Sequence, residues 1–187
     1  MTELKNLKEY RFHDKAGWGE GPWQSEPDKM QWIDEGTDLD CLMVRGPSGA
    51  WCGYVGVMEG HPFFEKDYSA YPGPGDMDVH GGVTFASLCQ EDKKEHGVCH
   101  VPAAGRSDHV WWIGFDCAHS WDHCPKFDGD PLGVIPAPSP GAVARHLSDA
   151  VDFGGGFETT YKDLDYVQQE IRSLAKQIKE VYDKAVM

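Results

Sequence analysis

Thiol and imidazole side chains gather in two short stretches of the sequence. The first, "CQEDKKEHGVCH", covers residues 89–100, and the second, "CAHSWDHC", covers residues 117–124. Thiolates and neutral imidazoles are the usual ligands of zinc, so both stretches could hold a metal ion. Neither contains the C-x-x-C pair of common structural zinc sites, so cysteines packed as small apolar side chains are the alternative. The donors are Cys89, His96, Cys99, His100, Cys117, His119, His123 and Cys124.

Two further side chains could do chemistry where predicted strands meet loops. Asp116 closes the apolar run "VWWIGFD" and could bind a metal ion, act as a general base or accept a hydrogen bond from a ligand hydroxyl. The alternative for this carboxylate is the capping of nearby backbone N–H groups. His80 precedes Gly81 and Gly82, whose backbone freedom lets a ligand approach closely. The alternative for His80 is a loop histidine bonded to a nearby carbonyl.

These residues give two overlapping candidate sites. The candidate metal ligands, with zinc as the ion, are His80, Cys99, His100, Asp116, Cys117 and His119. The candidate contacts to a small-molecule ligand are His80, Gly81, Gly82, Trp112, Asp116 and Arg106. No catalytic residue is assigned, because the sequence has neither the Gly-x-Ser-x-Gly elbow nor a phosphate-binding Gly-Lys-Ser/Thr pattern.

Short apolar or alternating runs predict the strands that position these residues. Strands are expected over residues 39–45, 50–58, 82–90, 98–102 and 109–117. The turn signal "GPSG" between the first two predicts a β-hairpin. In the last strand, alternation places Trp112 and Asp116 on one face and Cys117 on the other.

A long amphipathic helix is expected from a cap at Thr160 to about Lys184. Its apolar stripe, at spacings of three or four, consists of Leu164, Val167, Ile171, Leu174, Ile178 and Val181. We expect the stripe to pack on the sheet, and a homodimer formed through it is the alternative. Hairpin-like strands followed by one late helix favour an α+β fold: an antiparallel β-sheet with a long C-terminal amphipathic helix packed on it.

We expect one domain over residues 1–187. Within it we expect an irregular Trp-rich segment (1–36), a β-rich core (39–124), a Pro/Gly-rich loop region (125–158) and the helix (160–184).

The bulk properties limit the partners and the compartment. The net charge is −14 at pH 7, which disfavours nucleic acid because such binding depends on Lys and Arg contacts to phosphate. The sequence contains no run of ~18 apolar residues, so no membrane span is expected. The polar N-terminus lacks the apolar region of a signal peptide. We therefore expect a cytoplasmic protein, whose six cysteines are free thiols, core residues or metal ligands.

Four stretches, "DVHGGVTFA", "GVCHVP", "WWIGFDCAH" and "YKDLDYVQQEI", together resemble a group of uncharacterised proteins from bacteria, bacteriophages and other mobile elements. The resemblance covers roughly residues 40–180. It implies a small cytoplasmic single domain with a site formed by His80, Cys99, His100, Asp116, Cys117 and His119. A phage setting would favour interaction with a host, including capture of a nucleotide signal.

Three functions stay open on the sequence alone. The first is a small-molecule binding protein, with a nucleotide-like ligand in an aromatic, His- and Asp-containing pocket. The second is a metal-dependent hydrolase in which His80, His100, Asp116 and His119 hold the ion. The third is a structural or interaction protein whose Cys and His side chains simply pack.

Overall fold

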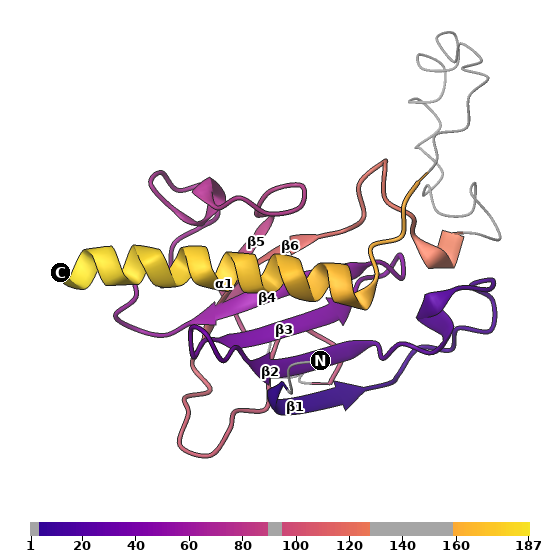
Figure 1. The fold of residues 1–187 in the computed structure, drawn as a ribbon, viewed down its shortest axis with the longest axis horizontal. Coiled ribbons are helices and arrows are strands. Elements are labelled where there is room, and N and C mark those ends of the chain that lie inside the picture. The colour runs from indigo at the N-terminus through magenta and orange to yellow at the C-terminus, as the bar shows by residue number, and fades with distance from the viewer. Residues whose placement is uncertain (1–3, 90–94, 128–158) are drawn as a thin grey trace, which may run out of the picture.

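The computed structural model describes residues 4–89, 95–127 and 159–187. Six antiparallel strands form one sheet in the order β1-β2-β3-β4-β6-β5, and a long helix lies along one face of it (Figure 1). The predicted α+β fold is confirmed. The strands are β1 (Lys5–Tyr10), β2 (Lys29–Ile33), β3 (Asp40–Arg45), β4 (Trp51–Val57), β5 (Phe85–Leu88) and β6 (Trp111–Asp116). The helix is α1 (Leu164–Val186), and short 3-10 turns cover Pro22–Gln24, Pro74–Asp76 and Pro125–Phe127.

Strands β3 and β4 form the predicted hairpin, and β6 extends the sheet beyond it. Asp40 lies opposite Gly56 and Arg45 opposite Trp51 in the β3–β4 ladder. Strand β6 pairs with both β4 and β5, so it is a central strand, in keeping with its apolar sequence. The backbone N–H of Cys117 still donates to the carbonyl of Trp51 (2.9 Å), which fixes the point where β6 gives way to the next loop.

The face of the sheet toward α1 holds the larger apolar core. The stripe residues Val167, Ile171, Leu174 and Ile178 are each 0% exposed, so the predicted packing of the helix on the sheet is confirmed. Gly53 of β4 permits the close approach of the helix. A Cβ atom there would lie 2.6 Å from the Phe115 ring and 2.8 Å from Cγ1 of Ile171.

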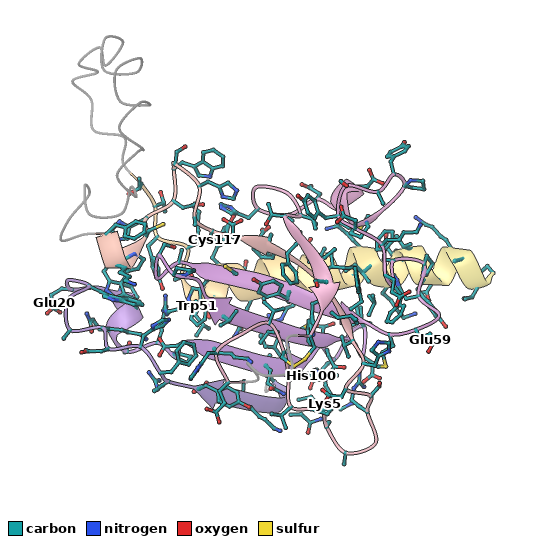
Figure 2. All side chains as sticks on the ribbon, turned by 180° about the vertical axis from the view of Figure 1, so that it is seen from behind. Lys5, Glu20, Trp51, Glu59, His100 and Cys117 are labelled. Carbon is teal, nitrogen blue, oxygen red and sulfur yellow. A yellow bond between two sulfur atoms is a disulfide. The ribbon has the colours of Figure 1, made fainter. Side chains whose placement is uncertain are left out.

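Among the described residues, loops rather than a helix cover the opposite face of the sheet. Its smaller core contains Leu42, Tyr54 and Trp112. The chain around residues 97–101 crosses this face, held by Nζ of the buried Lys29, which donates to the carbonyls of Gly97 (3.0 Å) and Cys99 (2.6 Å). Figure 2 views the molecule from this side, with His100 labelled over the sheet.

The partly buried carboxylate of Glu26 joins the N-terminal segment to the start of α1. Oε2 of Glu26 accepts hydrogen bonds from Nη2 of Arg45 (2.6 Å) and from the Tyr161 hydroxyl (2.5 Å). Burial raises the pKa of Tyr161, so its hydroxyl stays a donor. The helix itself begins at Leu164, because Asp163 caps it by accepting the N–H of Tyr166 (2.8 Å). The predicted cap at Thr160 is therefore wrong by three residues.

The irregular segment predicted for residues 1–36 is wrong in part, because it contains β1 and β2. Strand β1 is a largely exposed edge strand, so its sequence "KNLKEY" lacks the apolar alternation of a half-buried strand. Strand β2 is buried at every position, including Lys29, whose charge is held by carbonyls that the sequence does not reveal. The tryptophans of residues 1–36 do pack inward as expected, since Trp18, Trp23 and Trp32 are buried.

The strand predicted for residues 98–102 is also wrong. Val101 bonds to the side-chain amide of Gln31 rather than to a neighbouring strand (2.8 and 3.0 Å). Cys99 forms a disulfide with Cys89, because the 97–101 segment returns to the end of β5 and brings the two Cα atoms to 4.7 Å. The expectation that the six cysteines are free thiols, core residues or metal ligands did not include this disulfide.

Two remaining expectations concern the loop region and the membrane. Residues 128–158 of the predicted loop region lie outside the described residues. Within the described part of the chain, no helix combines the length and the apolar character that a membrane crossing requires.

Removal of the Ile171 side chain tests the packing of α1. We expect Ile171→Ala to lower the free energy of unfolding by about 3 kcal/mol, because a fully buried side chain leaves a cavity between the helix and β4. Urea denaturation followed by circular dichroism measures this. Lys176→Ala, at an exposed position of the same helix, should change stability by less than about 0.5 kcal/mol. Equal effects of the two substitutions would contradict the packing described here.

Candidate metal centre

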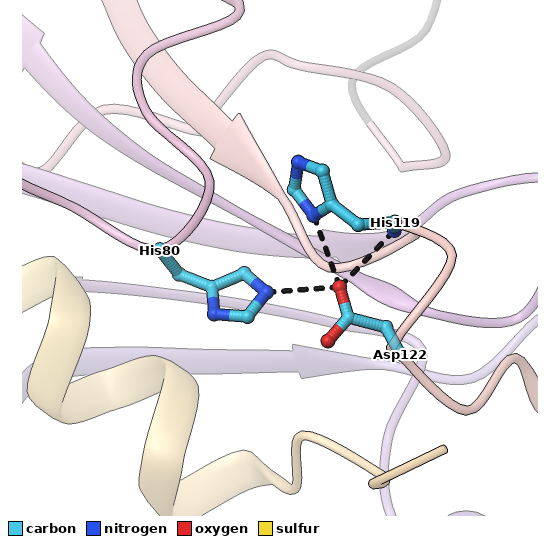
Figure 3. Close-up of side chains that lie close together, drawn as sticks. All are labelled: His80, His119 and Asp122. Carbon is cyan, nitrogen blue, oxygen red and sulfur yellow. Dashed lines mark hydrogen bonds and ion pairs between the residues drawn. The ribbon is translucent and has the colours of Figure 1, made fainter. Parts of the chain in front are cut away.

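Two histidines converge on one buried carboxylate beside the N-terminal half of α1 (Figure 3). Nε2 of His80 lies 2.9 Å from Oδ2 of Asp122, and Nδ1 of His119 lies 3.0 Å from the same oxygen. The backbone N–H of His119 donates to that oxygen as well (3.1 Å). One carboxylate oxygen therefore gathers three donors from two segments that lie about forty residues apart in the sequence.

His80 is positioned by a loop that is anchored on both sides in the core. Val79 and Val83 are buried against the helix side of the sheet, which leaves His80 between two fixed points. The loop closes through a hydrogen bond from Gly82 N–H to the carbonyl of Val79 (2.9 Å). Thr84 N–H then donates to the carbonyl of Gly114 in β6 (2.9 Å), so the loop enters the sheet in a defined register.

His119 and Asp122 lie on the turn that follows β6. Asp122 N–H donates to the carbonyl of His119 (2.9 Å), which brings the two side chains to the same side of the turn. The turn is tied to the chain that leads into α1, because Thr160 N–H donates to the carbonyl of Trp121 (3.1 Å). Asp122 and Thr160 form an isolated parallel bridge.

One face of α1 completes the surroundings of the histidines. The hydroxyl of Tyr166 lies 3.0 Å from Nδ1 of His80, and Oε2 of Glu170 accepts the backbone N–H of His80 (2.8 Å). Nζ of Lys162 lies 3.8 Å from Oδ1 of Asp122. Tyr166 and Glu170 are spaced by four and share one side of α1. Lys162 precedes the helix, and its Nζ lies 5.3 Å from the centre of the Tyr166 ring.

The carboxylate of Asp122 is held in its charged form. Burial by itself raises the pKa of Asp122, but the hydrogen bonds from His80 and His119 outweigh this and leave the pKa below its ordinary value. The side chain of Asp122 is 1% exposed, so its charge is compensated by protein groups rather than by water. The nearby Cys117 thiol is also buried, and burial raises its pKa, so it is no candidate for a thiolate nucleophile.

The ring of His119 lies close to a glycine and to an exposed tryptophan. The Trp121 ring stacks on the imidazole with an interplanar angle of 5° and a centroid distance of 4.8 Å. Trp121 itself is 55% exposed to solvent. Gly81 has φ +66°, and a Cβ atom there would lie 2.2 Å from Nε2 of His119. The glycine is therefore required both by its backbone conformation and by the contact with the imidazole.

His80, His119 and Asp122 can hold a metal ion. Their ligand atoms all lie within 4.8 Å of one another, and two imidazole nitrogens with one carboxylate oxygen suit zinc and related divalent ions. Among the described residues, the ligand atoms of a second group also lie within 4.8 Å of one another: Cys89, Cys99 and Asp108.

The structure does not bring together the six metal ligands predicted from the sequence. His80 and His119 meet, but the other four lie outside their group of ligand atoms. Asp116 accepts hydrogen bonds from the Thr84 hydroxyl (3.0 Å) and from Ala118 N–H (3.1 Å), as the capping alternative expects. His100 packs on Trp112, on the face of the sheet opposite α1, and Cys99 is in the disulfide.

The predicted small-molecule contacts are dispersed in the same way. Trp112 is 0% exposed, and Arg106 is paired with Asp38 and Asp40, whose oxygens lie 3.1 Å from its guanidinium nitrogens. Within this set, His80 and Gly81 lie next to His119, and Gly82 belongs to the same loop as His80.

Asp122 is the functional candidate that the sequence reasoning missed, together with the helix residues around His80. The signal for Asp122 was the spacing His119-x-x-Asp122, which allows two side chains to meet across one turn. The signal for Tyr166 and Glu170 was their spacing of four, which places two side chains on one face of a helix. Neither spacing indicates that these residues contact His80, because that contact depends on tertiary structure. The missed residues are Trp121, Asp122, Lys162, Tyr166 and Glu170.

Comparison of the chain with models of protein families, with curated proteins and with solved structures gave no match.

Two glycine substitutions separate the effect of backbone strain from the effect on His119. Gly81 and Gly82 both have positive φ, but only at Gly81 does a Cβ atom collide with the imidazole. We expect Gly82→Ala to cost about 1 kcal/mol of stability from the left-handed backbone. We expect Gly81→Ala to cost roughly 2–3 kcal/mol, because it also displaces His119 from Asp122.

Urea denaturation of both variants measures the difference. Equal losses of stability at the two positions would show that His119 does not depend on the space above Gly81.

Proposed function

We propose that the protein is a metal-dependent hydrolase whose ion, of the zinc type, is held by His80, His119 and Asp122. The observation that carries the proposal is the convergence of two imidazole nitrogens on one oxygen of a buried carboxylate, at 2.9 and 3.0 Å. Such a cluster offers an ion the neutral nitrogen and anionic oxygen donors of many catalytic zinc sites.

The number of ligands supports a catalytic rather than a structural role. Structural zinc is usually held by four protein ligands, whereas catalytic zinc is held by three and keeps a position for water or substrate. An ion held by these three residues would supply a bound water of lowered pKa as the nucleophile for hydrolysis. The exposed ring of Trp121 beside His119 supplies an apolar surface on which a substrate can rest.

The residues around the ligands have the roles that outer residues take in metal sites. When Nε2 of His80 binds the ion, its Nδ1–H can donate to the Tyr166 hydroxyl, which fixes the tautomer and the direction of the ring. Glu170 fixes the backbone of the same residue. Lys162 lies near the second oxygen of Asp122 and offsets its charge.

Capture of a small molecule remains the second function considered, and the geometry favours it less. The aromatic and basic side chains expected to line a pocket are buried in the core or already paired, as Trp112 and Arg106 are. Binding of a nucleotide-like signal, and any link to a phage, stay predictions from the sequence.

Zinc binding tests the proposed site directly. We expect the purified, oxidised chain to bind one Zn²⁺ per molecule in isothermal titration calorimetry. His80→Ala, His119→Ala and Asp122→Asn should each abolish this binding, because two ligands cannot retain the ion. The loaded protein should hydrolyse at least one member of a panel of phosphate-ester, carboxylic-ester and amide reporter substrates, and chelation should stop the reaction.

The matched control is His109→Ala, which removes an exposed imidazole outside the cluster and should leave zinc binding intact. Circular dichroism establishes that each variant is folded. Absence of zinc binding by the folded wild-type chain would refute the proposal, as would unchanged binding in all three ligand variants. Binding without hydrolysis of any reporter would leave the metal site standing and refute the hydrolase.

Removal of one hydroxyl tests the support of His80. We expect Tyr166→Phe to weaken zinc binding about ten-fold or more, because the substitution removes the partner of Nδ1 and leaves all three ligands in place. Tyr182→Phe, at an exposed position later in α1, is the control and should bind zinc as the wild type does. An unchanged dissociation constant for Tyr166→Phe would mean that the hydroxyl does not orient the ring.

A further inference from the structure

A second cluster of donor atoms lies on the face of the sheet that α1 does not cover. It consists of Cys89 after β5, Cys99 in the crossing segment and Asp108 before β6, whose ligand atoms lie within 4.8 Å of one another. In the structure the two sulfur atoms are joined as a disulfide, seen as the yellow bond near His100 in Figure 2. Two thiolates and a carboxylate are themselves a ligand set for zinc and other soft divalent ions.

We infer that Cys89, Cys99 and Asp108 form a redox-gated metal site, closed as the disulfide and open to a zinc-type ion after reduction. A dithiol reductant transfers two electrons and two protons to the disulfide, so that the S–S bond passes to the reductant and Cys89 and Cys99 become thiols. The ion then binds both sulfurs as thiolates, and the two thiol protons leave to solvent.

The two cysteines keep their positions when the S–S bond is cut, because the chain on either side of them is held by bonds that do not involve sulfur. Lys29 donates to the carbonyl of Cys99 at 2.6 Å, and the Gln31 amide bonds both backbone groups of Val101. Leu88, next to Cys89, pairs with Trp111 at the end of the β5–β6 ladder. A site that is already assembled loses little conformational entropy when it binds an ion.

Access to the cluster comes from one side. Cys99 is 0% exposed, whereas Asp108 is exposed and Cys89 is half-buried. A cavity of about 210 Å³ is lined by Cys89 and Asp108 together with Leu88, His109 and Val110. A reductant can therefore reach the sulfur of Cys89, and an ion can enter beside Asp108 without opening the core.

Cobalt titration of the full chain in its oxidised and reduced states tests the inference. Cobalt bound to thiolates gives a sulfur-to-metal charge-transfer band in the near ultraviolet, which cobalt bound by His and Asp alone does not give. We expect the band, and one further equivalent of bound metal, to appear after reduction and to be absent in the oxidised protein. Cys89→Ser should lose both, and Asp108→Asn, at an exposed position, should weaken this equivalent about ten-fold or more.

Two controls keep this site apart from the others. Cys52→Ser removes a free thiol outside the cluster and should retain the band. His80→Ala should also retain it, so failure of the proposed hydrolytic site leaves this result unchanged. Absence of the band in the reduced wild type would overturn the inference, as would a band that survives in Cys89→Ser. Loss of the band in Cys52→Ser alone would assign the thiolate ligands elsewhere and overturn it as well.

Discussion

The buried charge of Asp122 is the constraint on which the candidate site depends. A carboxylate at 1% exposure is costly unless polar groups of the protein replace the lost water. Here two imidazoles and a backbone N–H share one of its oxygens, and Lys162 lies 3.8 Å from the other. Meeting this requirement draws together the loop before β5, the turn after β6 and the approach to α1. The same convergence creates a set of metal ligands.

The long helix connects that site to the core. One side of α1 packs Ile171 and Leu174 against the sheet, and the adjoining side presents Tyr166 and Glu170 to the His80 loop. The position of His80 is therefore set by the same packing that stabilises the fold. A small shift of the helix would move Tyr166, the partner of His80, and leave His119 and Asp122 in place on the turn after β6.

The sequence predicted the parts of the fold that local patterns specify. The hairpin, the central strand β6 and the apolar stripe of α1 follow from alternation, a turn signal and helical spacing. It did not predict β1 and β2, because an exposed edge strand and a strand with a buried lysine break those patterns. The same limit applies to the site. His80 and His119 were visible as chemistry, but their meeting point at Asp122 depends on contacts across some forty residues.

X-ray absorption of the oxidised protein loaded with one equivalent of zinc tests the central claim most directly. The account predicts nitrogen and oxygen neighbours alone, at about 2.0–2.2 Å, with the multiple-scattering pattern of two imidazoles. Sulfur neighbours at about 2.3 Å would place the ion on cysteine and contradict the assignment to His80, His119 and Asp122.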